Sequence, residues 1–113
     1  RKADVELVSR ALRAYQDDHK FLPIEATGSG KIRSCGKNGE STCEWGEGKI
    51  VDDQNVVYMS KLPVDPFAFK GWTYMYDGEK LYVAVENKRD KGIRSGLTIQ
   101  CGNGVECNWY VEI

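Results

Sequence analysis

The sequence predicts an α+β fold in which one long N-terminal helix packs on a small antiparallel sheet of three or four strands. Apolar residues recur at helical spacing near the N-terminus, whereas they alternate along short segments in the second half of the chain. The chain has 113 residues, of which 41% are hydrophobic, and this size suits one core and one domain over residues 1–113. We expect the helix to bury its apolar face on the sheet.

The helix is expected from Asp4 to about His19, and residues 1–22 are assigned to the helical region. Pro23 ends it, because proline disfavours helix in the preceding residue. Arg1 and Lys2 would lie unfavourably at the positive end of the helix dipole, which favours a helix that continues upstream. Apolar positions at steps of three and four predict a buried face made of Val5, Val8, Leu12 and Tyr15.

Residues 23–61 have a different composition, with six glycines between positions 28 and 48 among polar side chains. This composition favours a long surface loop over a packed element, and such a loop needs a tether. A disulfide between Cys35 and Cys43 would supply the tether, and Trp45 is expected to anchor the loop to the domain.

Residues 62–113 are assigned to the sheet. The clearest hairpin signal is the pair of segments 72–76 and 81–85, which flank the turn dipeptide Asp77-Gly78. Alternation places Trp72, Tyr74 and Tyr76 on one face of the first strand. Two further short strands are predicted at residues 97–99 and 109–113, joined across the segment that contains the last two cysteines.

The four cysteines form two close pairs, and disulfide bonds are the preferred interpretation. Paired ligands of structural zinc sites are usually separated by about two to four residues, whereas seven and five residues intervene here. Zinc and free thiols remain the alternatives. Three connectivities are possible, and pairing of neighbours is favoured because a short loop costs little to close. Disulfides imply an oxidising compartment. The predicted pairs are Cys35 with Cys43 and Cys101 with Cys107.

The sequence does not favour catalysis, a metal site or a cofactor, so we expect none of the three. The net charge of −1 gives no global attraction to nucleic acid or to an anionic membrane. A Ser-His-acid arrangement and a phosphate-binding glycine motif are both missing. Asp17, Asp18 and His19 are interpreted as a solvated helix end, because adjacent side chains on a helix point in different directions. Asp52-Asp53 is interpreted as a turn.

Two further groups of residues would allow a binding function. The first is a basic run opposed only by Asp90, which is either an exposed connecting loop or a contact for nucleic acid or a partner. The second is a set of aromatic residues, Trp72, Tyr74 and Tyr82, which could line a carbohydrate groove but are more often core. The basic run consists of Lys88, Arg89, Lys91 and Arg94.

Two segments, which cover about half of the chain, resemble the type IV pilins and the type II secretion pseudopilins. The first segment runs from Asp4-Val5 through Ala11-Leu12, Tyr15 and Asp18 to Leu22-Pro23. The second includes Leu-Pro-Val-Asp-Pro at 62–66, Gly-Trp-Thr-Tyr at 71–74, Tyr-Asp-Gly at 76–78 and the run that ends in Glu-Asn at 86–87. Lys20 and Leu22 replace the usual Gly and Tyr of the family.

The resemblance implies a non-catalytic filament subunit. It implies a hydrophobic N-terminal helix upstream of Arg1. A prepilin peptidase would process this helix, which would anchor the subunit in the inner membrane and later pack in the filament. The partners would be other pilin subunits, in a homo- or hetero-polymer, and the inner-membrane assembly machinery. The subunit would end in a periplasmic or extracellular filament. Alternatives are a small secreted, disulfide-stapled carbohydrate-binding or adhesin module, and a DNA-binding minor pilin of an uptake pilus.

The C-terminal region favours the pilins over the pseudopilins. The major pseudopilins of the family carry a calcium loop there, whereas residues 89–104 contain only one carboxylate, Asp90. Calcium takes about six to eight oxygen ligands. The close cysteine pair in this region resembles the stapled C-terminal region of many type IV pilins.

Overall fold

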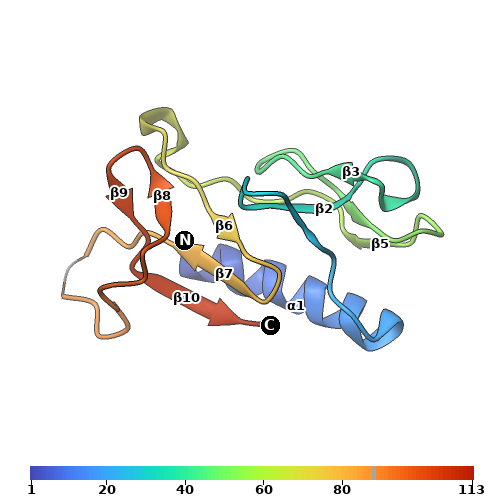
Figure 1. Cartoon of the computed structure of the whole chain (residues 1–113), viewed down its shortest axis with the longest axis horizontal. Coiled ribbons are helices and arrows are strands. Elements are labelled where there is room, and N and C mark those ends of the chain that lie inside the picture. Colours follow the sequence, from blue (N-terminus) through green and yellow to red (C-terminus); the bar gives the residue numbers. More distant parts are fainter. Residues whose placement is uncertain (88) are drawn as a thin grey trace.

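The computed structural model describes residues 1–87 and 89–113 and has the predicted α+β class. A single long helix, α1 (Lys2–His19), lies behind an antiparallel sheet with the strand order β10-β7-β6 (Figure 1). These strands are β6 (Met75–Tyr76), β7 (Lys80–Val83) and β10 (Trp109–Glu112). The molecule is elongated, with extents of 43 × 26 × 22 Å. Within the described ranges, no helix has the length and apolar character required to cross a membrane.

The helix packs through the face that its periodicity predicts. Val5, Val8 and Leu12 are completely buried and Tyr15 is nearly so, whereas Arg10 and Arg13 are exposed. Leu81 and Val83 of β7 belong to the same core, which explains how α1 is held on the sheet. Lys20, in the left-handed conformation, ends the helix, and its N–H donates to the carbonyl of Gln16.

The prediction of a long surface loop at residues 23–61 is wrong. β1 (Glu25–Ala26), β2 (Lys31–Cys35) and β3 (Ser41–Thr42) form one small sheet, and β4 (Ile50–Val51) and β5 (Val57–Met59) form another. A short 3₁₀ turn, η1 (Lys37–Gly39), lies between β2 and β3. The two sheets occupy the end of the molecule opposite the hairpin of β8 (Gln100–Gly102) and β9 (Val105–Glu106) (Figure 1).

Two isoleucines explain why residues 23–61 pack instead of protruding. Ile32 and Ile50 are completely buried in the same core as the helix. The glycines make the tight connections between these strands, and Gly30 illustrates the requirement. Its φ is +72°, and a Cβ at this position would overlap the side chain of Met75. Glycine here therefore permits close packing against the central sheet.

The second half of the chain follows the predicted order with shorter strands. The hairpin has the predicted turn, and its register pairs Met75 with Tyr82 and Tyr76 with Leu81. The expected strand at 97–99 is wrong, because Thr98 has a left-handed φ of +60°, which interrupts an extended backbone. The strand begins instead at β8 (Gln100–Gly102), which pairs with β9 (Val105–Glu106).

Trp72 does not share a face with Tyr74 and Tyr76 as the alternation predicted. The backbone before β6 is irregular and includes the 3₁₀ turn η2 (Ala68–Lys70), and the N–H of Trp72 donates to the carbonyl of Phe67. Tyr74 and Tyr76 are buried in the core beneath α1, whereas Trp72 packs in a second cluster. The buried members of that cluster are Tyr82, Ala84, Cys101 and Cys107.

The predicted disulfide bonds are present. Cys35 is bonded to Cys43 and Cys101 to Cys107, across sequence separations of 8 and 6 residues. The first bridge belongs to the core beneath α1, and the second belongs to the smaller cluster on the other side of β7. Each core cluster therefore contains one covalent cross-link.

Candidate functional site

The N-terminal end of α1 carries a network of paired charges. The Nε atom of Arg1 donates to Oδ1 of Asp65 at 3.2 Å, and its guanidinium lies 2.8 Å from a carboxylate oxygen of Glu86. Nζ of Lys2 lies 2.6 Å from Oδ1 of Asp90. The two cations at the positive end of the helix dipole are therefore compensated by these carboxylates. The charges of Arg1 and Lys2 therefore do not by themselves indicate that the helix continues upstream of α1.

Asp65 gives the Leu-Pro-Val-Asp-Pro segment a structural role. Its carboxylate is fully buried, and Oδ1 also accepts the N–H of Phe67 at 2.8 Å. The guanidinium of Arg1 lies 4.4 Å from the centre of the Phe67 ring. This segment therefore fixes the start of the helix against the domain.

A second polar contact connects the helix with the central sheet. The hydroxyl of Tyr74 donates to Oδ2 of Asp4 at 2.6 Å. Burial of the phenol, together with the hydrogen bond to the carboxylate of Asp4, raises the pKa of Tyr74 far above its ordinary value. Tyr74 therefore stays neutral and acts as a hydrogen-bond donor that ties the first turn of α1 to the residues before β6.

The basic run lies on the connection between β7 and β8. Lys88 lies outside the described residues, and Arg89, Lys91 and Arg94 are exposed. Arg94 donates to the hydroxyl of Tyr110 at 2.9 Å, and its guanidinium lies 4.6 Å from the Tyr110 ring centre. Lys2 and the N–H of Gly92 lower the pKa of Asp90, and Lys2 pairs this carboxylate with the start of α1.

The aromatic residues considered for carbohydrate binding are not exposed together. Tyr74 and Tyr82 are buried, whereas Trp72 is half-buried. Trp72 and Arg94 do share the wall of a groove of about 550 Å³, together with Glu106 and Asn108. This groove therefore offers one aromatic side chain, and not the three-membered platform that the sequence suggested.

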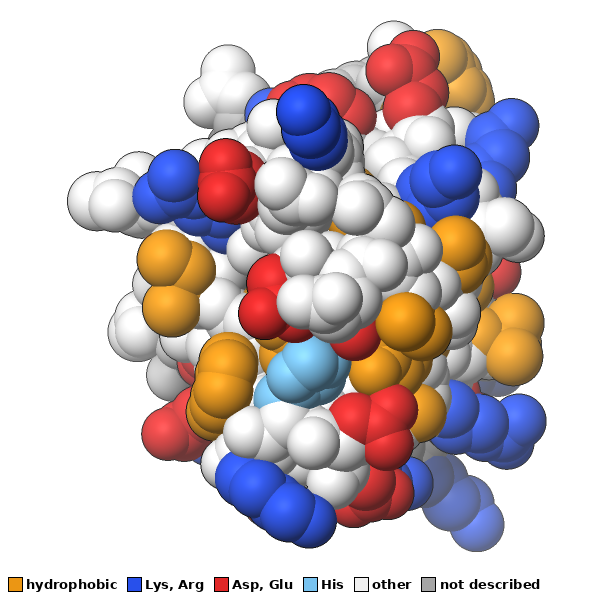
Figure 2. Space-filling model, turned by 90° about the vertical axis from the view of Figure 1, so that its right-hand side faces the viewer, with side chains coloured by type: hydrophobic (Ala, Val, Ile, Leu, Met, Phe, Trp, Pro, Cys, Tyr) orange, Lys and Arg blue, Asp and Glu red, His pale blue; other side chains and the backbone are white. Residues whose placement is uncertain are grey.

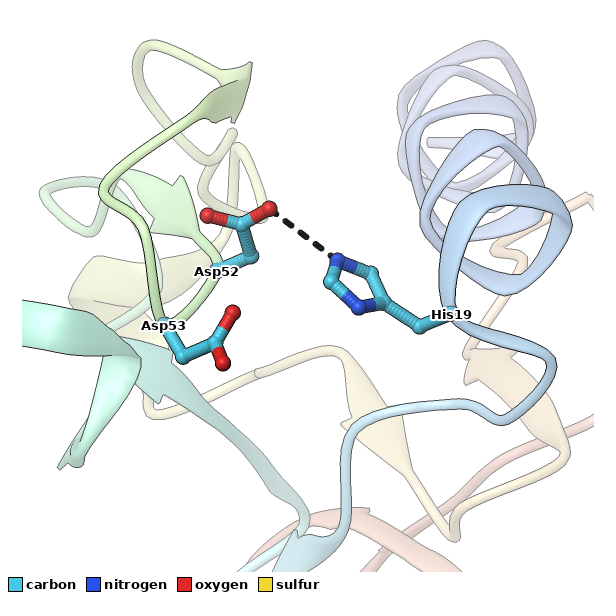
Figure 3. Close-up of side chains that lie close together, drawn as sticks. All are labelled: His19, Asp52 and Asp53. Carbon is cyan, nitrogen blue, oxygen red and sulfur yellow. Dashed lines mark hydrogen bonds and ion pairs between the residues drawn. The ribbon is translucent and has the colours of Figure 1, made fainter.

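One cluster brings together residues from two parts of the chain that are distant from one another in the sequence. His19 lies at the end of α1, and Asp52 and Asp53 follow β4 (Figure 3). Nε2 of His19 is 3.0 Å from Oδ2 of Asp52, and ligand atoms from the three side chains all lie within 4.8 Å of one another. The imidazole is visible at the surface, with acidic and hydrophobic side chains beside it (Figure 2).

The side chain of Asp52 is fixed by its own turn. Oδ1 accepts the N–H groups of Gln54 and Val56, both at 2.9 Å, which leaves Oδ2 directed at His19. Burial pushes the pKa of Asp52 up, but the hydrogen bonds from Val56, Gln54 and His19 outweigh it and lower the pKa below its ordinary value. The carboxylate is therefore ionised over the neutral pH range.

The His19 ring is also positioned by its neighbours. Its centre lies 4.4 Å from that of Tyr15, and the Tyr58 hydroxyl lies 3.4 Å from Nε2. The hydroxyl of Tyr58 donates to Oδ2 of Asp18 at 2.7 Å. Asp18 therefore orients Tyr58, which lies beside the cluster. Local spacing could not reveal this cluster, because His19 and Asp52 are 33 residues apart and meet only when the β4–β5 hairpin packs beside α1.

Comparisons of the chain with models of protein families, with curated proteins and with solved structures found no match.

Proposed function

We propose that this chain is a structural, non-catalytic subunit of a type IV pilus or of a related secretion pseudopilus. The resemblance in the helix and in the Leu-Pro-Val-Asp-Pro and hairpin segments motivates the proposal. In it, a hydrophobic helix upstream of α1 anchors the subunit in the inner membrane and later packs in the filament. Assembly machinery and other pilin subunits are then the partners, and the globular domain forms the outer wall of a periplasmic or extracellular filament.

The main support is an apolar groove beside α1. Leu7 of the helix is 51% exposed and Val64 is 47% exposed, and both line a groove of about 390 Å³ with Met59, Leu62 and Pro63. Apolar side chains that are exposed together are typical of protein contact surfaces. The occupant in this proposal is a second copy of the chain, packed beside the helix as adjacent subunits pack in a filament.

The exposed face of α1 suits the same role. It carries charges of both signs, including Glu6, Arg10 and Arg13. Opposite charges on identical neighbours can pair across an interface and fix the register between copies. The burial of Tyr74 and Tyr82 gives the carbohydrate-binding alternative no comparable support.

Photo-crosslinking in the source cells tests the proposal. A photoreactive amino acid at Leu7 of the full-length protein is expected to give a ladder of covalent multimers at multiples of the subunit mass. Thr27, an exposed residue on the β1–β2 connection that does not line the groove, is the control and should give a weaker ladder. Monomer alone from both positions would contradict assembly, and equal ladders would contradict the role of the groove.

A further inference from the structure

We propose that His19, Asp52 and Asp53 form a binding site for a borderline divalent cation, with Zn²⁺ as the best fit. The proposal goes beyond the filament function and does not depend on it. A site at this position would connect the C-terminal end of α1 with the turn between β4 and β5, two parts of the chain that are distant in sequence (Figure 3).

The spacing of the ligand atoms suits a metal. Zinc lies about 2.0–2.2 Å from imidazole nitrogen and carboxylate oxygen, so two of its ligand atoms are separated by roughly 3–3.5 Å. Nε2 of His19 and Oδ2 of Asp52 are already 3.0 Å apart. Asp53 is exposed, and the three ligand atoms lie within 4.8 Å of one another. A rotation of this one exposed side chain would therefore complete a set of three ligands.

Two of the ligands are held in place before a cation arrives. The N–H groups of Gln54 and Val56 hold Oδ1 of Asp52, which directs Oδ2 at Nε2 of His19. A cation bound between these two atoms would replace the proton of their hydrogen bond. Tyr15 packs against the ring of His19. Ligands that are already oriented lose little conformational freedom on binding. Contacts that orient metal ligands, as Gln54, Val56 and Tyr15 do here, typically change metal affinity by about 10- to 100-fold.

The chemistry of the ligand set selects the class of metal. One imidazole nitrogen with two carboxylates suits zinc and its neighbours in the first transition series. Calcium takes about six to eight oxygen ligands and does not use imidazole nitrogen as zinc does. Three protein ligands leave at least one coordination position for water or for a side chain from another molecule.

Asp53 provides a clean test, because its side chain makes no hydrogen bond or ion pair within residues 1–87 and 89–113. Asp53→Asn should therefore fold normally while it removes a ligand. His19→Gln removes the nitrogen ligand, and Asp17→Asn, at an exposed acid on the same helix outside the cluster, is the matched control.

The experiment titrates the untagged chain with ZnCl₂ and measures heat of binding and melting temperature. We expect one Zn²⁺ per chain and a rise in melting temperature that CaCl₂ at the same concentration does not give. Asp53→Asn and His19→Gln should each weaken binding by about 10-fold or more, whereas Asp17→Asn should bind as the unmodified chain does. Absence of zinc binding, or equal binding by all four proteins, would overturn the proposal.

Discussion

Replacing Leu12 with Ala is expected to lower the free energy of unfolding by about 2–5 kcal/mol. Leu12 lies in the middle of α1 and is completely buried in the core that the helix shares with the sheet. The substitution removes apolar contacts and leaves a cavity that the surrounding structure fills only in part. Urea denaturation at neutral pH, followed by tryptophan fluorescence, measures the change.

Leu7 provides the matched control on the same helix. The residue type is the same, but 51% of the side chain is exposed, so Leu7→Ala should change the free energy of unfolding by less than about 1 kcal/mol. Similar losses in the two variants would mean that α1 does not pack on the sheet through its Leu12 face. Both variants replace Leu with Ala on the same helix, so the change in helix propensity is the same in each. The difference between their free energies of unfolding therefore measures the packing of Leu12.

The second large effect is expected from the disulfide between Cys35 and Cys43. The double variant Cys35→Ala/Cys43→Ala should lose about 2–3 kcal/mol, because the bridge restricts the unfolded chain over a separation of 8 residues. Both cysteines are also buried in the core beneath α1, so their replacement removes packing around Ile32 and Ile50. Urea denaturation under non-reducing conditions measures the loss.

Cys101→Ala/Cys107→Ala is the companion variant. Its separation of 6 residues predicts a similar loss of about 2 kcal/mol, now from the smaller cluster. Mass spectrometry should show a gain of two hydrogens per bridge when the unmodified chain is reduced. An unchanged mass on reduction, or stability in both double variants equal to that of the unmodified chain, would contradict the role given to the bridges.

The sequence predicted well those features that depend on local spacing. The helical period identified Val5, Val8, Leu12 and Tyr15, all of which are buried, and helix α1 starts two residues before the expected Asp4. The Asp77-Gly78 turn and close cysteine spacing likewise gave the hairpin and the disulfide pairs. In each of these cases the pattern that predicts the feature lies within a short stretch of the sequence.

Features that depend on distant partners could not be predicted in this way. Residues 23–61 have a loop-like composition, yet Ile32 and Ile50 pack into the core with residues of α1 and β7. Thr98 has a strand-forming side chain, but its backbone is left-handed in this fold. The meeting of His19 with Asp52 depends on how the β4–β5 hairpin packs beside the helix, which local periodicity does not encode.

The filament proposal is tested most directly by locating the protein on its source cells. Surface filaments are sheared from the cells, purified and labelled with gold-conjugated antibodies raised against this chain. We predict labelling along the whole filament, or at discrete points if the subunit is a minor one, and peptides of the chain in the purified filaments. Detection of the protein only as a monomer in the medium, with unlabelled filaments, would contradict the proposal.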